Sequence, residues 1–134
     1  MVAGVGTDLL SIERIRRAVE DPAVDSAFLV RTFTERERAE ARLRPDPVLY
    51  FATRFAGKEA VFKCLGLDGG WVRLDEIEIL NAENGQPFVV LTGEFRRKAE
   101  LNGIADIHIS LSHDTDYALA FAVAQAADPQ EETR

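Results

Sequence analysis

The segment RFAGKEAVFKCLG, residues 54–66, carries the pattern that decides the fold. At about 100° per residue, a helix through this segment gathers its apolar side chains on one stripe. The stripe consists of Phe51, Phe55, Phe62 and Leu65. Lys58 lies in the middle of the stripe, while Glu59 and Lys63 share a neighbouring face. We therefore expect a helix over residues 48–65, with its apolar stripe turned to the core.

Lys58 is out of place on an apolar stripe, because a charge among apolar side chains needs a partner or a path to water. In one interpretation, Lys58 extends its amino group to solvent beside an ordinary Glu59–Lys63 surface pair. In the other, the helix presents Glu59 and Lys63 to a charged ligand. The helix alone leaves both interpretations open.

The composition indicates one globular domain. The chain has 134 residues, of which 46% are hydrophobic and 29% charged. It does not begin with a signal-peptide pattern, and no apolar run approaches the ~20 residues of a membrane span. Cys64 is the single cysteine and is expected to pack in the core, and we expect a cytoplasmic protein.

The net charge of −7 argues against nucleic acid as the main partner. The basic residues nevertheless concentrate between residues 11 and 63. A partly basic face on an acidic protein suits an anionic ligand or an acidic partner, although a solvated helix surface gives the same pattern.

The elements before this helix are predicted from apolar spacing and capping residues. Residues 2–10 indicate a buried strand that ends near Asp8. Ser11 then begins a helix with an inward stripe of Ile12, Ile15 and Val19. A capping box at residues 34–37 opens a short helix that stops at Pro45. Asp46-Pro47 starts the long helix.

The second half of the chain is richer in strands. An Asn84-Gly85 turn joins two of them, and the predicted elements are strands 75–80 and 87–92, a helix over 93–102, and strands 108–112 and 117–124. The apolar strand 117–124 is consistent with burial on both faces. The order β-α-α-α-β-β-α-β-β predicts an α+β domain with a largely antiparallel sheet over residues 1–125. The polar residues 126–134 are expected to be a disordered tail.

Three segments, taken in order, resemble a known family. They are GVGTDLLSIERI (4–15), RFAGKEAVFKCLG (54–66) and ISLSHDTDYALAFAV (109–123). They are similar to the holo-[acyl-carrier-protein] synthase family, the short 4′-phosphopantetheinyl transferases. The resemblance also includes RTFTERE (31–37) and the 81–87 hairpin, and so covers nearly the whole chain.

The resemblance implies an activity and an assembly. The family transfers the 4′-phosphopantetheine group of coenzyme A to a serine of an apo acyl or peptidyl carrier protein and releases adenosine 3′,5′-bisphosphate. It assembles as a homotrimer with active sites at subunit interfaces. In such a trimer, His113 would serve a site whose Asp8 and Glu59 come from a neighbouring subunit.

The resemblance assigns the catalytic chemistry to Asp8, Glu59 and Lys63. Asp8 and Glu59 match the family's metal-binding carboxylates, and Mg²⁺ typically uses one or two such groups. The metal would polarise the diphosphate, while Lys63 and Arg54 would neutralise charge on the phosphoryl oxygens. Glu59 is the candidate general base for the serine proton, either directly or through a metal-bound water.

The binding residues follow from the same match. Arg54 and His113 correspond to positions that contact coenzyme A phosphates, together with Lys63. Arg14 matches a helix position that meets the carrier protein, and Arg17 also points away from the apolar stripe of its helix. Because such carriers are usually acidic, both arginines are predicted docking residues.

Each assignment has a plain structural alternative. Asp8 at a strand end could simply begin a turn, His113 could be an ordinary hairpin residue, and Arg14 could be an ordinary exposed arginine. His108 has only the plain interpretation, because strand alternation puts it opposite Ile107 and Ile109, and the resemblance gives it no role.

The chain also departs from the family pattern. Where the family continues into Gly-Thr-Gly, Gly66 is followed by residues 67–71, LDGGW, and Phe62 stands where a small or hydroxyl residue is common. The alternative function is a coenzyme A-binding or carrier-docking module without catalysis, against which the intact carboxylates argue. A purely structural trimer would leave the charges of residues 58–63 unexplained.

Overall fold

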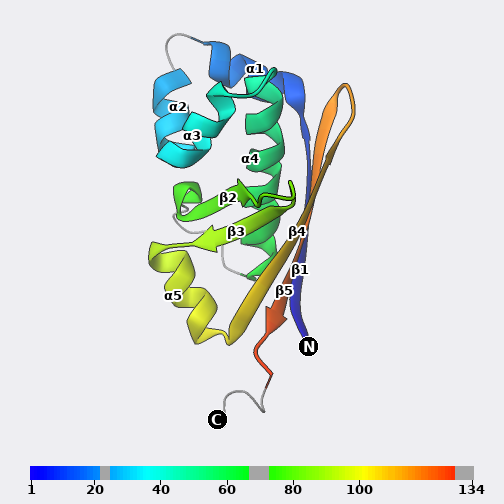
Figure 1. Cartoon of the computed structure of the whole chain (residues 1–134). Coiled ribbons are helices and arrows are strands. Elements are labelled where there is room, and N and C mark those ends of the chain that lie inside the picture. Colours follow the sequence, from blue (N-terminus) through cyan, green and yellow to red (C-terminus); the bar gives the residue numbers. More distant parts are fainter. Residues whose placement is uncertain (22–24, 67–72, 129–134) are drawn as a thin grey trace.

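The computed structural model describes residues 1–21, 25–66 and 73–128 (Figure 1). Within these ranges the elements are β1 (Val2–Ser11), α1 (Ile12–Glu20), α2 (Asp25–Thr32), α3 (Glu35–Arg42), α4 (Pro47–Cys64), the 3₁₀ turn η1 (Leu74–Glu76), β2 (Ile77–Asn81), β3 (Pro87–Leu91), α5 (Gly93–Leu101), β4 (Ile104–His113) and β5 (Tyr117–Ala126). The α+β class is confirmed. The predicted order is also confirmed, except that the sequence analysis did not predict α2.

Helix α4 begins as expected and runs along the long strands (Figure 1). Its N-cap, Asp46, accepts a hydrogen bond from the backbone N–H of Leu49 at 3.1 Å, and Pro47 occupies the first turn. Of its apolar stripe, Phe51 is buried and Phe55 is partly buried. The predicted central helix is therefore confirmed.

The strands form two antiparallel sheets rather than one. The larger sheet has the order β1-β5-β4, and the smaller one pairs β2 with β3. The β2–β3 hairpin turns through Asn84-Gly85, where Gly85 has a φ of +87°. This positive φ suits glycine and explains why the turn could be predicted.

Within the single chain, strand β5 is buried on one face only. Four alanines of β5 face α4 and are fully buried, namely Ala118, Ala120, Ala122 and Ala124. The residues between them point to the outer face, where Phe121 is 48% exposed. On β1, which was also expected to be buried, Val5 and Leu9 are 58% and 63% exposed. The sequence hid this asymmetry because both faces of β5 are apolar.

Helix α4 approaches β1 very closely at two glycines. A Cβ atom added at Gly6 would collide with the carbonyl oxygen of Ala60, and one at Gly4 with that of Cys64. Only residues without a side chain allow this approach. Asp8 lies on the same face of β1 as these glycines. The strand was expected to end near Asp8, but it continues to Ser11. Asp8 is thereby brought beside the last turns of α4.

Lys58 does not reach solvent, because its side chain is 0% exposed. Its Nζ donates a hydrogen bond to Glu37 Oε1 at 2.7 Å and to the backbone carbonyls of Leu74 and Ile77 at 3.0 and 2.5 Å. Burial lowers the pKa of Lys58, and the charge of Glu37 opposes this shift. Lys58 therefore has a buried partner, which is a structural role and not the solvent path of the first interpretation.

Glu37 also completes the predicted capping box. Its Oε1 accepts a hydrogen bond from the N–H of Thr34 at 2.9 Å, while the Thr34 hydroxyl accepts one from the N–H of Glu37. Its Oε2 accepts a third hydrogen bond from the N–H of Ile79 at 2.9 Å. One carboxylate thus joins α3, α4 and β2.

Helix α2 was missed because its apolar residues do not have helical spacing. Phe28 and Leu29 are adjacent, and the helix gains its stability from packing. The ring of Phe28 lies 6.0 Å from the rings of both Phe33 and Phe55. This contact places α2 beside α4.

The two ends of the chain differ slightly from expectation. Ala126 is the last residue of β5, and the N–H of Ala127 donates to the carbonyl of Gly103 at 2.8 Å. Residues 129–134, most of the expected tail, and the LDGGW departure from the family pattern lie outside the described residues.

No helix in the described part of the chain is long and apolar enough to cross a membrane. Cys64 is buried, and burial raises the pKa of its thiol to about 11, as suits a core residue.

Candidate active site

Asp8, Glu59 and Lys63, here called the carboxylate cluster, lie together at the contact between β1 and α4. The Nζ of Lys63 lies 3.3 Å from Asp8 Oδ1 and donates a hydrogen bond to the carbonyl of Thr7 at 3.0 Å. Asp8 is largely covered, whereas about half of the Lys63 side chain is exposed. Segments far apart in the sequence therefore build this cluster.

The carboxylate of Asp8 disfavours the charged form of Glu59. Burial and the nearby Asp8 raise the pKa of Glu59, and Lys63 opposes this shift. The described residues hold no group of three or more His, Cys, Asp or Glu side chains arranged for a metal. Mg²⁺, however, needs only one or two carboxylates when substrate phosphates and water complete its shell. Two close carboxylates with surplus negative charge fit that requirement.

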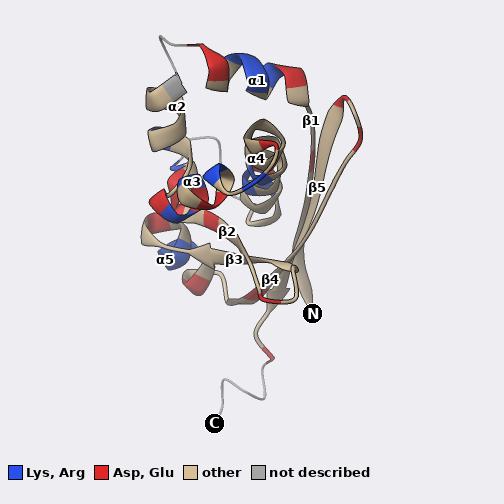
Figure 2. Ribbon diagram, turned by 45° about the horizontal axis from the view of Figure 1, so that its top comes forward, with Lys and Arg blue, Asp and Glu red and all other residues tan. Residues whose placement is uncertain are grey.

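A pocket of about 490 Å³ opens beside the carboxylate cluster. Asp8, Glu59 and Arg14 line it together with apolar side chains that include Phe28 and Phe55. Arg14 lies on α1, where charged residues of both signs alternate (Figure 2). The predicted docking residue Arg14 therefore adjoins the carboxylates.

Arg17 is farther from this pocket. Its side chain is exposed, and its Nε lies 3.6 Å from Glu13 Oε1. It does not line the pocket beside the carboxylates. The structure thus brings one of the two predicted docking arginines to the site.

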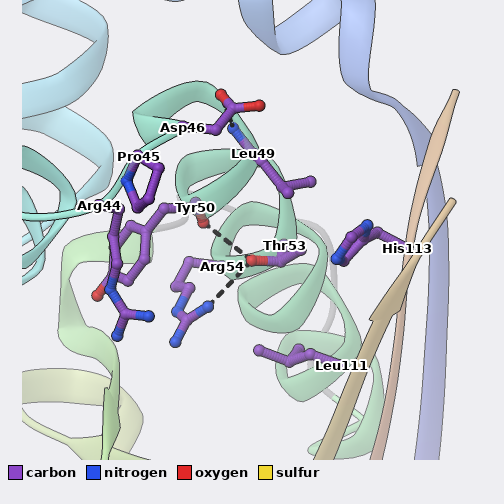
Figure 3. A pocket seen from close by; sticks show the side chains of 9 residues that line it. All are labelled: Arg44, Pro45, Asp46, Leu49, Tyr50, Thr53, Arg54, Leu111 and His113. Carbon is purple, nitrogen blue, oxygen red and sulfur yellow. Dashed lines mark hydrogen bonds between the residues drawn. The ribbon is translucent and has the colours of Figure 1, made fainter. Parts of the chain in front are cut away.

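A second pocket, of about 370 Å³, lies between the first half of α4 and the end of β4 (Figure 3). Arg44, Tyr50, Arg54 and His113 line it, and we call it the arginine pocket. Of the three predicted phosphate-contacting residues, the structure brings Arg54 and His113 into this pocket within a single chain, whereas Lys63 does not line it. His108 does not line it; that side chain is exposed and lies 2.9 Å from Gln125.

Arg54 is held firmly in the arginine pocket. It donates hydrogen bonds to Thr53 Oγ1 at 3.1 Å and to the side-chain oxygen of Asn81. Its guanidinium carbon lies 4.1 Å from the centre of the Tyr50 ring. Burial lowers the pKa of Arg54, but an arginine stays protonated in proteins. The pocket therefore contains a fixed, buried positive charge.

The sequence analysis missed three residues of this environment, namely Arg44, Tyr50 and Asn81. Tyr50 and Arg54 are one turn apart on α4, which is a signal that could have been used. Arg44 and Asn81 lie in other segments, and no local pattern in the sequence connects them with Arg54.

The carboxylate cluster and the arginine pocket lie on opposite sides of α4. From the helical repeat, Lys63 is about 180° around the helix from Arg54 and about 13 Å along its axis. Glu59 is about 140° around from Arg54 by the same repeat. Among the described residues, the two pockets share no lining residue. One chain therefore presents two separate candidate sites, which we call half-sites.

The outer face of the larger sheet is apolar and exposed. It includes Val5 and Leu9 of β1 and Tyr117, Leu119 and Phe121 of β5. Charged residues gather on the helices, whereas the three long strands carry few (Figure 2). An apolar face of this kind marks an interaction surface.

Comparison with known proteins shows the class to which this fold and these half-sites belong. The model of the 4′-phosphopantetheinyl transferase superfamily matches residues 4–122, and the chain belongs to this superfamily. The resemblance inferred from the three segments is thus confirmed.

The individual relatives are holo-[acyl-carrier-protein] synthases. The chain is 44% identical to that of Desulforudis audaxviator over 124 residues, which are 92% of this chain and 93% of the relative. The crystal structure from Neisseria meningitidis has a TM-score of 0.84 at 35% identity and covers 93% of this chain and 99% of that one. The Helicobacter pylori structure in complex with coenzyme A has a TM-score of 0.78 at 28% identity, covering 90% and 99%. These likenesses confirm the predicted fold.

Proposed function

We propose that the protein is a holo-[acyl-carrier-protein] synthase, which transfers 4′-phosphopantetheine from coenzyme A to a serine of an apo acyl carrier protein. The observation that carries this proposal is the carboxylate cluster, where two neighbouring carboxylates and a lysine meet. The relatives of this chain are holo-[acyl-carrier-protein] synthases. In the reaction, the serine Oγ bonds to the phosphorus that carries pantetheine. The bond to the other phosphate breaks, and adenosine 3′,5′-bisphosphate leaves.

Each residue of the cluster has a role in this proposal. Asp8 and Glu59 would hold Mg²⁺, which supplies Lewis acidity at the diphosphate when bound. Lys63 neutralises the negative charge that develops on the phosphoryl oxygens. Glu59 takes the proton from the serine hydroxyl, either directly or through a metal-bound water.

The arginine pocket supplies the binding of coenzyme A. Arg54 and His113 contact its phosphates in this proposal, and the buried guanidinium of Arg54 supports it. A bidentate arginine suits phosphate oxygens, and its hydrogen bonds to Thr53 and Asn81 orient it in advance.

We further propose a homotrimer in which each active site combines the carboxylate cluster of one subunit with the arginine pocket of the next. Two observations support this arrangement. The two half-sites lie on opposite faces of α4, and the exposed apolar face of β1 and β5 offers a surface for assembly. Coenzyme A would then bridge two subunits.

Helix α1 is the proposed docking surface for the carrier protein. Arg14 lines the pocket beside the carboxylates, and Arg17 extends the basic face of the same helix. Opposite charges across an interface accelerate encounter, which suits an acidic carrier. We place the enzyme in the cytoplasm, where its single cysteine stays reduced.

Incubation with an apo acyl carrier protein, coenzyme A and Mg²⁺ tests the activity directly. The proposal expects the carrier to gain the mass of phosphopantetheine and adenosine 3′,5′-bisphosphate to accumulate in equal amount. Binding of coenzyme A or of the carrier without the mass gain would instead support a binding module without catalysis. Apo peptidyl and polyketide carriers in parallel reactions would show which carriers are served.

A further inference from the structure

Two buried polar atoms in the arginine pocket have no hydrogen-bond partner among the described residues. They are the hydroxyl oxygen of Tyr50 and the Nε of Arg54. The two side chains are only 4% and 8% exposed, and both line the pocket. Buried polar atoms are nearly always paired in folded proteins. Two such atoms on the wall of one pocket therefore point to a ligand that completes their hydrogen bonds.

The Tyr50 ring also organises the positive charges of this pocket (Figure 3). The guanidinium carbons of Arg54 and Arg44 lie 4.1 and 5.4 Å from its centre, in cation–π contact. Arg44 is further oriented by an ion pair with Glu40 at 3.0 Å. One aromatic ring thus brings two arginines to the same wall of the pocket.

We propose that Tyr50 is a nucleotide-binding residue of this pocket, whose hydroxyl donates a hydrogen bond to a phosphate oxygen of coenzyme A while its ring aligns Arg44 and Arg54. The inference rests on the proposed function for the identity of the ligand. It extends that function to a residue that the family pattern did not single out. The phosphate in question belongs to the adenosine 3′,5′-bisphosphate part of coenzyme A.

The chemistry of the hydroxyl supports a donor role. Burial raises the pKa of Tyr50, so the phenol keeps its proton at neutral pH. Phosphate oxygens accept hydrogen bonds and do not donate them when ionised. The phenolic oxygen can accept a hydrogen bond from a guanidinium group while its proton is donated to an anion, so a protonated phenol beside two guanidinium groups adds a further donor for an anion.

The alternative is that Tyr50 only fills space in the core. Phenylalanine would then serve nearly as well, because the interaction of the hydroxyl with the Arg54 guanidinium leaves the phenolic proton without an acceptor among the described residues. The substitution Tyr50→Phe separates the two interpretations, since it removes a single oxygen and keeps the ring. Tyr50→Leu removes the ring as well.

The test is isothermal titration of the purified protein with adenosine 3′,5′-bisphosphate, which needs neither a carrier nor turnover. Tyr50→Phe is expected to raise the dissociation constant about tenfold, the usual effect of one hydrogen bond to a charged group, and Tyr50→Leu to raise it further. Arg42→Ala is the matched control, since Arg42 is exposed, lies near Arg44 and does not line the pocket. It should leave the dissociation constant unchanged.

A parallel titration with adenosine 5′-monophosphate identifies the phosphate. If Tyr50→Phe weakens only the bisphosphate, the hydroxyl contacts the 3′-phosphate, and if it weakens both nucleotides, it contacts the 5′-phosphate. The thermal midpoint of Tyr50→Phe should change little from that of the unsubstituted protein, because the phenolic proton has no acceptor among the described residues. A marked fall would show that the hydroxyl has an internal partner and would overturn the inference.

The outcome can be separated from that of the proposed function. If the unsubstituted protein binds the bisphosphate and both Tyr50 variants bind it equally well, the inference is wrong and the transferase activity is untouched. If binding depends on Tyr50 but no carrier is modified, the inference stands as a nucleotide site and the proposed transferase activity fails.

Discussion

The carboxylate cluster and the arginine pocket are built in different ways, although both depend on α4. The cluster joins Asp8 of β1 to the last turns of α4 through glycine contacts, and its charges partly neutralise one another. The arginine pocket is built around the first half of α4 and keeps unpaired donors. The cluster therefore has surplus acceptors and the pocket surplus donors. A phosphate-containing substrate needs hydrogen-bond donors for its oxygens, which the arginine pocket has, and carboxylates that can hold a cation, which the cluster has.

Loss of a carboxylate should have the largest effect. Asp8→Ala and Glu59→Ala are each expected to raise the activation barrier by about 2–4 kcal/mol, which slows turnover roughly 30- to 1000-fold. Each carboxylate positions charge at the reacting phosphate. The fold should survive, since neither is a core residue. Steady-state rates at saturating coenzyme A and varied Mg²⁺ measure this. Glu94→Ala, on exposed α5, is the control. Near-normal rates at limiting Mg²⁺ would refute the ligand assignment.

The next largest effect is expected from a substitution at the close contact between β1 and α4, which positions Asp8 in the carboxylate cluster. Gly6→Ala places a Cβ against the carbonyl of Ala60 and should push β1 away from α4. We expect a loss of about 1–3 kcal/mol in the free energy of unfolding, together with slower turnover, because Asp8 leaves Glu59. Urea unfolding and kcat report the two losses.

Nucleotide binding distinguishes the two half-sites in this variant. The arginine pocket does not involve β1, so Gly6→Ala should still bind adenosine 3′,5′-bisphosphate normally. Equal loss of binding and turnover would show that the two half-sites are not built independently.

A substitution on the proposed docking surface should have a smaller effect, which is confined to the KM for the carrier protein. Arg14→Glu is expected to raise KM for the carrier about tenfold at low salt and to leave KM for coenzyme A nearly unchanged, because a rim charge acts on encounter. Arg96→Glu, on the distant α5, is the matched control. If the carrier KM of Arg14→Glu is normal at every salt concentration, α1 is not the docking surface.

The smallest effect concerns the repulsion between the carboxylates. Because the pKa of Glu59 in the folded protein lies above its ordinary value, the stability that the protonated carboxyl contributes is lost as the pH rises through the folded pKa. Glu59→Gln removes this loss, so its thermal midpoint without metal should exceed that of the parent at pH 7 and match it well below pH 4.5.

Mg²⁺ provides the companion measurement. A cation held by both carboxylates stabilises the folded state by mass action, so Mg²⁺ should raise the thermal midpoint of the parent more than that of Glu59→Gln. The proposed metal site would be contradicted if Mg²⁺ raised the thermal midpoints of the parent and of Glu59→Gln equally. The proposed effect of the Glu59 charge would be contradicted if Glu59→Gln had a lower midpoint than the parent at pH 7 without metal.

Local signals explain what the sequence could predict. The capping box at Thr34, the N-cap at Asp46 and the glycine turn at Gly85 each depend on neighbours within a few residues, and all three are present. The family resemblance similarly grouped Asp8, Glu59 and Lys63, which lie together in the structure. It also grouped Arg54 with Lys63 at the phosphoryl oxygens, but within one chain these two lie on opposite sides of α4.

What could not be predicted depends on distant partners. The carboxylate that neutralises Lys58 belongs to Glu37, on another helix, and the local sequence gave no sign of it. Asn81 reaches Arg54 only because β2 folds back onto α4. The exposure of the outer face of β5 could not be predicted either, because alanine on one face and large apolar residues on the other give a uniformly apolar sequence.

The central claim is that the two half-sites of one active site come from different subunits. It is tested most directly by co-expressing two inactive chains, Glu59→Ala and the double variant Arg54→Ala/His113→Ala. If the chains assemble at random in a symmetric trimer, about a quarter of the interfaces join two intact half-sites, and about a quarter of the native activity should return. The same variants purified separately and mixed without subunit exchange provide the control. If both chains fold and assemble but the co-expressed protein stays inactive, the active site is not shared in this way.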